Sequence, residues 1–159
     1  HRRSSAASDV YKRQVIHTPG HHPEHLCLIS NSGLVAGDMV AGIGTILIPP
    51  GEGDMMTYIT QLERLLDLDP HLIFPSHGPV IPLPSRTLEH YIRHRSIRHD
   101  RVLAAVEDGI SNLEAIAKVA YEDTPDAHPG LAVDQTLSHL LSHEKDGNVK
   151  RVDDGWVRA

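Results

Sequence analysis

The chain has 159 residues, a formal net charge of -6 and 40% hydrophobic residues, which is typical of one or two small folded domains. No apolar run is long enough to cross a bilayer, so the sequence argues against a membrane-spanning protein or a membrane partner. The single cysteine, Cys27, excludes an internal disulfide and lies in an apolar run, where we expect a small buried side chain. This cysteine usage favours a cytoplasmic location.

The first fourteen residues differ in character from the rest of the chain. They hold four of the fifteen Lys and Arg residues, and they show neither helical nor strand periodicity. Back-translation of SSAASDVYKRQ, residues 4–14, gives a nucleotide string that resembles the adaptor of a transposase-based sequencing library. We therefore interpret residues 1–14 as a non-native segment. Native sequence is expected from near Val15, with the true N-terminus and any targeting signal upstream.

Residues 15–84 predict strands, turns and one helix. Two short apolar runs, 26–30 and 34–36, are separated by Asn31-Ser32-Gly33, which is a hairpin signal. Asp54 is placed to cap a helix that ends before Pro70. The predicted apolar face of that helix consists of Met56, Ile59, Leu62, Leu65 and Leu66. Strands with a covering helix indicate an α/β layer.

Residues 85–159 predict a second domain of different kind, with its boundary at Pro82 to Ser85. Helical patterns cover 85–107, 112–121 and 133–144. Two short strands separated by a turn follow, over 149–158. Three helices followed by a small hairpin is the order of a winged-helix domain.

Three short blocks carry the chemistry: Thr18-Pro19-Gly20-His21, Gly37-Asp38 and Ser76-His77-Gly78-Pro79. Each block follows a short apolar run, and its glycine lets the backbone turn sharply at the end of a strand. A single loop histidine is more often a solvated side chain than a ligand, so the prediction depends on the three blocks together. His, Asp and His are side chains suited to zinc, and three strand ends can converge on one point.

The same blocks, in the same order, resemble the metallo-β-lactamase superfamily of metallohydrolases. The resemblance covers residues 15–81 and implies an α/β fold in which 15–84 is the C-terminal half of an αββα sandwich. It implies that His21 binds one metal, that His77 binds a second, and that Asp38 bridges both and is catalytic. The family motif His-x-His-x-Asp-His, which supplies the other ligands, does not occur in this chain.

The resemblance implies two zinc ions in a complete parent site, where a metal-bound hydroxide would attack an ester, thioester or phosphodiester. The nearby residues His17, His22 and His25 are candidates for contacts with the ligands or the substrate. We expect this chain alone to be inactive, because each zinc would have only two protein ligands. Half a sandwich would also leave an apolar sheet face and strand edges exposed, which favours aggregation.

The C-terminal residues leave the substrate open. Tyr91 to Arg95, with the terminal Gly155-Trp156, resemble the winged-helix extension of β-lactamase-like proteins related to a metal-dependent endoribonuclease, and some proteins of this architecture resemble thioester hydrolases. The resemblance thus implies a small molecule or RNA as the substrate. Residues 85–159 hold ten basic and thirteen acidic side chains, so DNA binding is not expected. Five arginines nevertheless concentrate positive charge on the first helix; they are Arg86, Arg93, Arg95, Arg98 and Arg101.

The competing interpretation is a binding module. In it the winged helix recognises nucleic acid or a partner protein, and the metal-like residues have no catalytic role. The sequence leaves the oligomeric state open.

Overall fold

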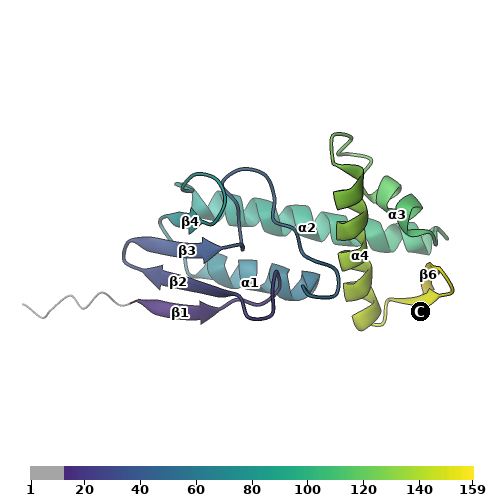
Figure 1. Ribbon diagram of the computed structural model, residues 1–159, viewed down its shortest axis with the longest axis horizontal. Helices are drawn as coiled ribbons and strands as arrows, with labels where there is room; N and C mark the ends of the chain where they lie inside the picture. Colours follow the sequence, from purple (N-terminus) through teal and green to yellow (C-terminus); the bar gives the residue numbers. More distant parts are fainter. Residues whose placement is uncertain (1–12) are drawn as a thin grey trace, which may run out of the picture.

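The computed structural model describes residues 13–159, which form a small sheet covered by helices and a helical region with a hairpin (Figure 1). The first part contains β1 (Gln14–His17), β2 (Leu26–Ser30), β3 (Gly33–Gly37), α1 (Met55–Asp67) and β4 (Ile73–Pro75). The second part contains α2 (Pro84–Glu107), α3 (Leu113–Ala120), α4 (Pro129–Lys145), β5 (Val149–Val152) and β6 (Gly155–Arg158). Residues 1–12 of the segment interpreted as non-native lie outside the described residues, whereas Gln14 already belongs to β1.

The four strands of the first sheet lie in the order β1-β2-β3-β4, with β3 and β4 parallel and the other pairs antiparallel. The predicted hairpin is present, since β2 and β3 pair across a tight turn. One face of the sheet packs against α1, which lies behind the strands in Figure 1. The core of this layer includes Ile16, Cys27, Leu34, Ala36, Ile59, Leu62, Leu65 and Ile73, all buried.

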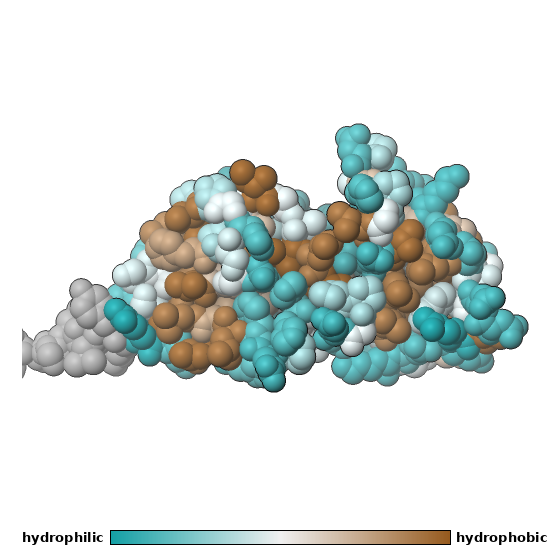
Figure 2. Space-filling view, viewed as in Figure 1, coloured by the Kyte–Doolittle hydropathy of each residue, from teal (hydrophilic) through white to brown (hydrophobic). Residues whose placement is uncertain are grey.

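The other face of the sheet carries a row of apolar side chains. Val15, Leu28, Val35 and Phe74 are neighbours across the four strands. Val15 is 62% exposed and Val35 is 47% exposed. Figure 2 shows apolar residues gathered over the strands on this face. Within the described residues, this face has no covering layer of helix or sheet.

Helix α1 begins after the predicted cap, because the Asp54 side chain accepts a 2.8 Å hydrogen bond from the Thr57 backbone N–H. The predicted apolar face was wrong at Met56, which is 37% exposed. Met55 and Tyr58 are buried in its place. The Tyr58 hydroxyl donates a 2.6 Å hydrogen bond to the Met39 carbonyl, so an aromatic with a polar tip fits this core.

The second part has its own core, formed between α2, α3, α4 and the hairpin. Its buried residues are Val102, Ala105, Val106, Ile116, Ala120, Leu140, Val149 and Trp156. The N-terminal half of α2 packs on the first core instead, through Leu88 and Tyr91. One helix therefore begins in the predicted boundary region and belongs to both cores. Helix α4 begins at Pro129, four residues before the predicted start, because proline is well tolerated at the first helical position.

The predicted concentration of positive charge on the first C-terminal helix holds only in part. Arg95 and Arg98 are each 2% exposed, and their guanidinium groups bind backbone carbonyls and side chains inside the protein. Arg101 is paired with Asp123 at 2.8 Å. Since buried arginines cannot meet phosphates, only Arg86 and Arg93 of the five remain exposed and unpaired among the described residues.

No helix between residues 13 and 159 combines the length and the apolar character needed to cross a membrane.

Candidate metal centre

The three predicted ligands meet at the end of β3. Asp38 follows directly after this strand, and its carboxylate lies between two imidazoles. Its Oδ2 is 3.7 Å from His21 Nε2, and its Oδ1 is 3.2 Å from His77 Nε2. The Oδ1 atom is buried and has no hydrogen-bond partner among the described residues. The carboxylate and both histidines therefore converge as the sequence blocks predicted.

Two glycines make this convergence possible. Gly37 has φ +54°, and a Cβ there would lie 2.6 Å from His25 Nε2. Gly20 has φ +137°, and a Cβ there would lie 2.4 Å from the Tyr58 Cα. A larger residue would be strained at either position and would collide with its neighbour. The glycines therefore let the backbone next to Asp38 approach His25, and the backbone next to His21 approach α1.

His25 holds the backbone of Asp38. Its Nε2 accepts a 3.0 Å hydrogen bond from the Asp38 N–H, and its Nδ1 lies 2.8 Å from the hydroxyl of the buried Thr18. Burial lowers the pKa of His25, and the nearby His21 lowers it further, so the neutral ring can serve as an acceptor. His25 thus positions the candidate ligand Asp38 through its backbone. It is one of the three histidines expected from the sequence as candidates for contacts with the ligands.

His21 is oriented by a backbone carbonyl. Its Nδ1–H donates a 2.7 Å hydrogen bond to the Leu47 oxygen, which fixes the proton on Nδ1. The lone pair of Nε2 is therefore free and lies on the side of Asp38. A carbonyl partner of this kind is common behind histidines that bind metals.

His77 is held through its own backbone. The turn that carries it is tied to the end of β3, because the Ser76 N–H donates to the Gly37 carbonyl at 3.1 Å. The His77 carbonyl accepts a 2.8 Å hydrogen bond from the Gly42 N–H. Its side chain is 70% exposed, in contrast to 24% for His21. His77 is thus the more open of the two histidines.

The other predicted histidines lie outside this convergence. His17 binds the Pro23 carbonyl through Nε2 at 2.7 Å, and His22 accepts a 3.2 Å hydrogen bond from the Glu24 N–H. Both side chains are exposed and bind the turn that follows β1. Because both side chains bind the local backbone, they stabilise the conformation of this turn.

Between residues 13 and 159, no group of three or more His, Cys, Asp or Glu side chains is arranged to hold a metal ion by itself. The donor chemistry still fits part of a metal site. The Asp38 carboxylate lies between two imidazoles, with its buried Oδ1 on the side of His77 and its Oδ2 on the side of His21, whose Nε2 lone pair is free. Zinc takes such oxygen and nitrogen ligands and ordinarily needs at least three from the protein.

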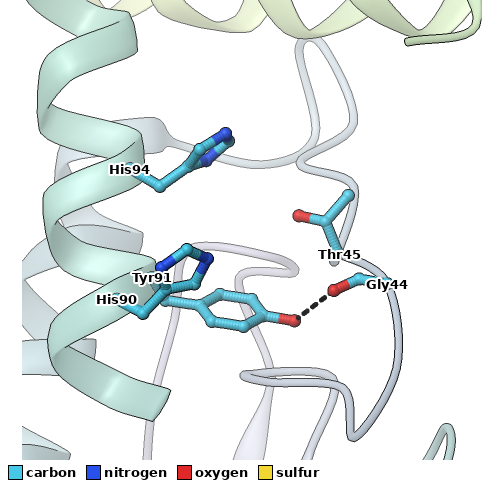
Figure 3. A pocket seen from close by; sticks show the side chains of 5 residues that line it. All are labelled: Gly44, Thr45, His90, Tyr91 and His94. Carbon is cyan, nitrogen blue, oxygen red and sulfur yellow. Dashed lines mark hydrogen bonds between the residues drawn. The ribbon is translucent and has the colours of Figure 1, made fainter. Parts of the chain in front are cut away.

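The loop after Asp38 is fastened to α2 beside a small pocket of about 90 Å³. Figure 3 shows the Tyr91 side chain reaching from α2 toward this loop, where its hydroxyl donates a 3.1 Å hydrogen bond to the Gly44 carbonyl. The same hydroxyl accepts a 3.1 Å hydrogen bond from the Ala41 N–H. His90 and His94 line the pocket along the same helix. Burial and the adjacent Arg95 lower the pKa of His94 to about 4.

The sequence did not single out Thr18 or Leu47 as functional. Thr18 stands in the first block, yet a threonine before Pro-Gly reads only as a turn residue. Leu47 contacts His21 through its backbone carbonyl oxygen, which every residue has, so the residue type at position 47 does not predict the contact. Only the three-dimensional path of the loop could reveal that contact.

The sequence profile of the Metallo-beta-lactamase superfamily matches residues 6–77. The chain is 38% identical over 141 residues to the Beta-lactamase-like protein 2 homolog of Drosophila melanogaster, covering 86% of this chain and 47% of that protein. The Caenorhabditis elegans homolog of the same name is 31% identical over 148 residues, covering 91% and 48%. The chain thus spans about half the length of the curated relatives it matches.

Known structures share the fold across most of the chain. A Beta-lactamase domain protein from Burkholderia ambifaria superposes with a TM-score of 0.79 at 23% identity, covering 94% of this chain and 49% of that one. A metallo-beta-lactamase family protein from Thermus thermophilus gives 0.73 at 20% identity, covering 92% and 49%. Both superpositions extend past residue 77 into the C-terminal helices. The profile, the relatives and the fold agree that this chain belongs to the metallo-beta-lactamase superfamily.

Proposed function

We propose that this chain is the C-terminal part of a zinc-dependent hydrolase of the metallo-beta-lactamase fold. The observation that carries the proposal is the Asp38 carboxylate between the Nε2 atoms of His21 and His77. In this arrangement His21 would bind one zinc, His77 would bind the other, and Asp38 would bridge them. The remaining ligands would come from the His-x-His-x-Asp-His segment expected upstream of Val15.

When bound, two zinc ions would supply an activated water and would polarise the ester, thioester or phosphodiester group of the substrate. The protein's own residues do the positioning. His25 holds the Asp38 backbone, and the Leu47 carbonyl keeps the His21 proton on Nδ1. These contacts fix the ligand atoms before a metal binds, so little rearrangement is needed at the site.

The C-terminal part supports a winged-helix assignment as a finer proposal. Helices α2, α3 and α4 precede the β5–β6 hairpin, in the order that the sequence predicted. With Arg95 and Arg98 buried, the exposed positive charge of α2 is small, so the proposal assigns this part a structural role beside the site. Neutralising Arg86 and Arg93 should therefore leave substrate affinity unchanged in a salt titration. A steep loss would favour anion recognition instead.

The test is to restore the upstream sequence. A protein that joins this chain to its natural upstream segment is expected to bind two zinc ions and to hydrolyse a thioester, an ester or RNA. The printed chain alone is expected to bind zinc weakly and to be inactive. A complete gene that lacks the His-x-His-x-Asp-His motif, or a complete protein that binds no zinc, would overturn the proposal.

A further inference from the structure

The orientation of His21 depends on one carbonyl, that of Leu47, and this carbonyl lies in a segment without helix or strand. Irregular segments tend to be mobile unless other groups hold them. A ligand oriented by a mobile carbonyl would sample both imidazole tautomers. Other parts of the chain must therefore hold the Leu47 segment if His21 is to keep its Nε2 lone pair available.

The residues on both sides of Leu47 are held by side chains from α2 and α4. The Ile46 carbonyl accepts a hydrogen bond from the buried guanidinium of Arg95 in α2. The Ile48 N–H donates to Gln135 Oε1 at 3.1 Å, and the Gln135 amide donates back to the Ile48 carbonyl at 3.0 Å. Ser138 adds a 2.6 Å hydrogen bond to the same carbonyl. The backbone is thus fixed directly before and directly after Leu47.

These contacts form one connected group. Arg95 donates a 2.9 Å hydrogen bond to Gln135 Oε1, so the arginine from α2 and the glutamine from α4 also hold each other. Arg95 reaches Thr45 as well, at 2.9 Å. Arg95 and Gln135 are only 2% and 5% exposed. Burying a guanidinium without a carboxylate partner is costly, and apolar residues would serve stability alone at least as well.

A second contact of α4 lies on the other side of His21. The Asp54 N–H donates a 2.8 Å hydrogen bond to the Gly20 carbonyl, directly before His21. The Asp54 carboxylate pairs with Lys145 near the end of α4 at 2.7 Å. Lys145 is 67% exposed, so this pair contributes little energy. It nevertheless places the C-terminal end of α4 beside the residues before His21, while Gln135 and Ser138 in the middle of α4 hold the Leu47 segment.

We propose that Arg95 and Gln135 are positioning residues for His21, holding the Leu47 carbonyl so that the imidazole keeps its proton on Nδ1 and presents Nε2 to Asp38. The C-terminal helices then form part of the metal centre's support. The role of His21 Nε2 as a zinc ligand rests on the proposed function. The orientation of the ring is a property of the metal-free chain and can be measured by itself.

The test reads the tautomer of His21 in the metal-free chain by long-range ¹H–¹⁵N NMR, with the signal assigned from a His21→Gln variant. The unsubstituted chain is expected to show the Nδ1–H tautomer alone. In Gln135→Met, which keeps the volume but loses the amide, both tautomers should appear. In the protein restored with its upstream segment, the zinc affinity of Gln135→Met, measured by competition with a chromophoric chelator, should be about 10- to 100-fold lower.

Thr136→Val is the matched control. Thr136 is equally buried in α4, but its hydroxyl binds the Ala132 carbonyl within the helix and does not reach the Leu47 segment. It should leave the tautomer and the zinc affinity unchanged. Should Gln135→Met fail to fold, Ser138→Ala removes one donor to the Ile48 carbonyl, and it should shift the tautomer in the same direction by a smaller amount.

A folded Gln135→Met variant with a single Nδ1–H tautomer and unchanged zinc affinity would overturn the positioning role. Failure of the proposed function gives a different result, in which no variant or parent binds zinc although the tautomer still responds to Gln135. The two hypotheses can therefore fail separately.

Discussion

Two regions of this molecule concentrate histidines, and they differ in what the ring nitrogens face. At the end of β3, the Nε2 atoms of His21 and His77 face one carboxylate whose Oδ1 is buried without a hydrogen-bond partner. Between α2 and α4, three histidines face one another and the backbone; they are His99, His139 and His143. In the first arrangement the ring nitrogens that face Asp38 are free to bind a metal, whereas in the second most ring nitrogens are already hydrogen-bonded within the protein.

In the helical cluster, the Nδ1 atoms of His99 and His139 lie 3.1 Å apart, so one donates to the other. The His143 ring stacks on His99 at 3.6 Å and donates through Nε2 to the His99 carbonyl at 3.0 Å. Burial lowers the pKa of all three side chains, that of His99 to about 4. Their rings serve as neutral packing groups. The number of histidines therefore does not identify a ligand site, whereas the partners of each nitrogen do.

The largest expected effect is at Asp38, the one residue that both candidate ligands share. In the protein restored with its upstream segment, Asp38→Ala should lower zinc affinity at least about 100-fold, because in the proposed site it removes a ligand from both metals. Most of the hydrolytic activity should be lost with it. Chelator competition and metal content per chain measure the loss.

Glu24→Gln is the control for Asp38→Ala, since it removes an exposed carboxylate near the same turn without touching Asp38. It should leave zinc content and activity unchanged. Equal losses in the two variants would indicate that general negative charge, and not the bridging position, determines metal binding.

The second prediction concerns acid and tests the helical cluster. The folded chain keeps these histidines neutral, whereas the unfolded chain takes up protons below pH 6.5. Stability should therefore be full above pH 6.5 and should fall as the pH drops toward 4, by about 2 kcal/mol in the free energy of unfolding. Arg95 and Arg98 oppose protonation of His139, while Asp100 and Asp146 favour that of His143. Denaturant titrations at pH 7.5, 5.5 and 4.5 measure the change.

Other titratable groups also affect stability in this pH range. Asp54 and Asp123 have lowered pKa values, so they stay ionised through most of this window. His25 and His94 also have lowered pKa values and contribute in the same direction. A free energy of unfolding that stays constant between pH 6.5 and 4.5 would contradict the burial of neutral histidines.

A smaller effect is expected from His139→Leu, which isolates the cluster from those other groups. His139 is fully buried, its Nε2 has no partner among the described residues, and its Nδ1 bonds to His99, so a leucine of similar size keeps the packing and removes this one hydrogen bond. At pH 7.5 the free energy of unfolding should fall by about 1 kcal/mol. Part of the acid sensitivity should disappear, and zinc binding should not change. A loss of zinc by this variant would show that the two histidine regions are coupled.

The sequence predicted those features that have a local cause. Three blocks with glycine turns placed His21, Asp38 and His77 together, and an aspartate cap placed the start of α1. The register of α1 was within reach of the sequence, since Met55 and not Met56 lies at helical spacing from both Ile59 and Leu62, and Met55 is the buried one.

The polar side of α4 was beyond prediction for a physical reason. The leucines of this helix indicate contact with a core, yet only Leu140 is fully buried and Leu137 and Leu141 are partly buried. The polar side chains of Gln135, Ser138 and His139 are buried as well. Buried polar residues depend on partners far along the chain, here the Ile48 backbone and His99. Hydrophobic patterns carry no information about such partners.

The smallest expected effect concerns the sheet, which has one covered face and one uncovered apolar face. The face toward α1 is buried, whereas the row of Val15, Leu28, Val35 and Phe74 is open. Val35→Thr keeps the shape of the side chain and its preference for strands but makes the centre of this row polar. It should weaken self-association of the printed chain by a few-fold in sedimentation velocity. Val119→Thr is the same change at a 40% exposed position on α3 and should have no effect. An equal effect of both variants would mean that association is not specific to the open sheet face.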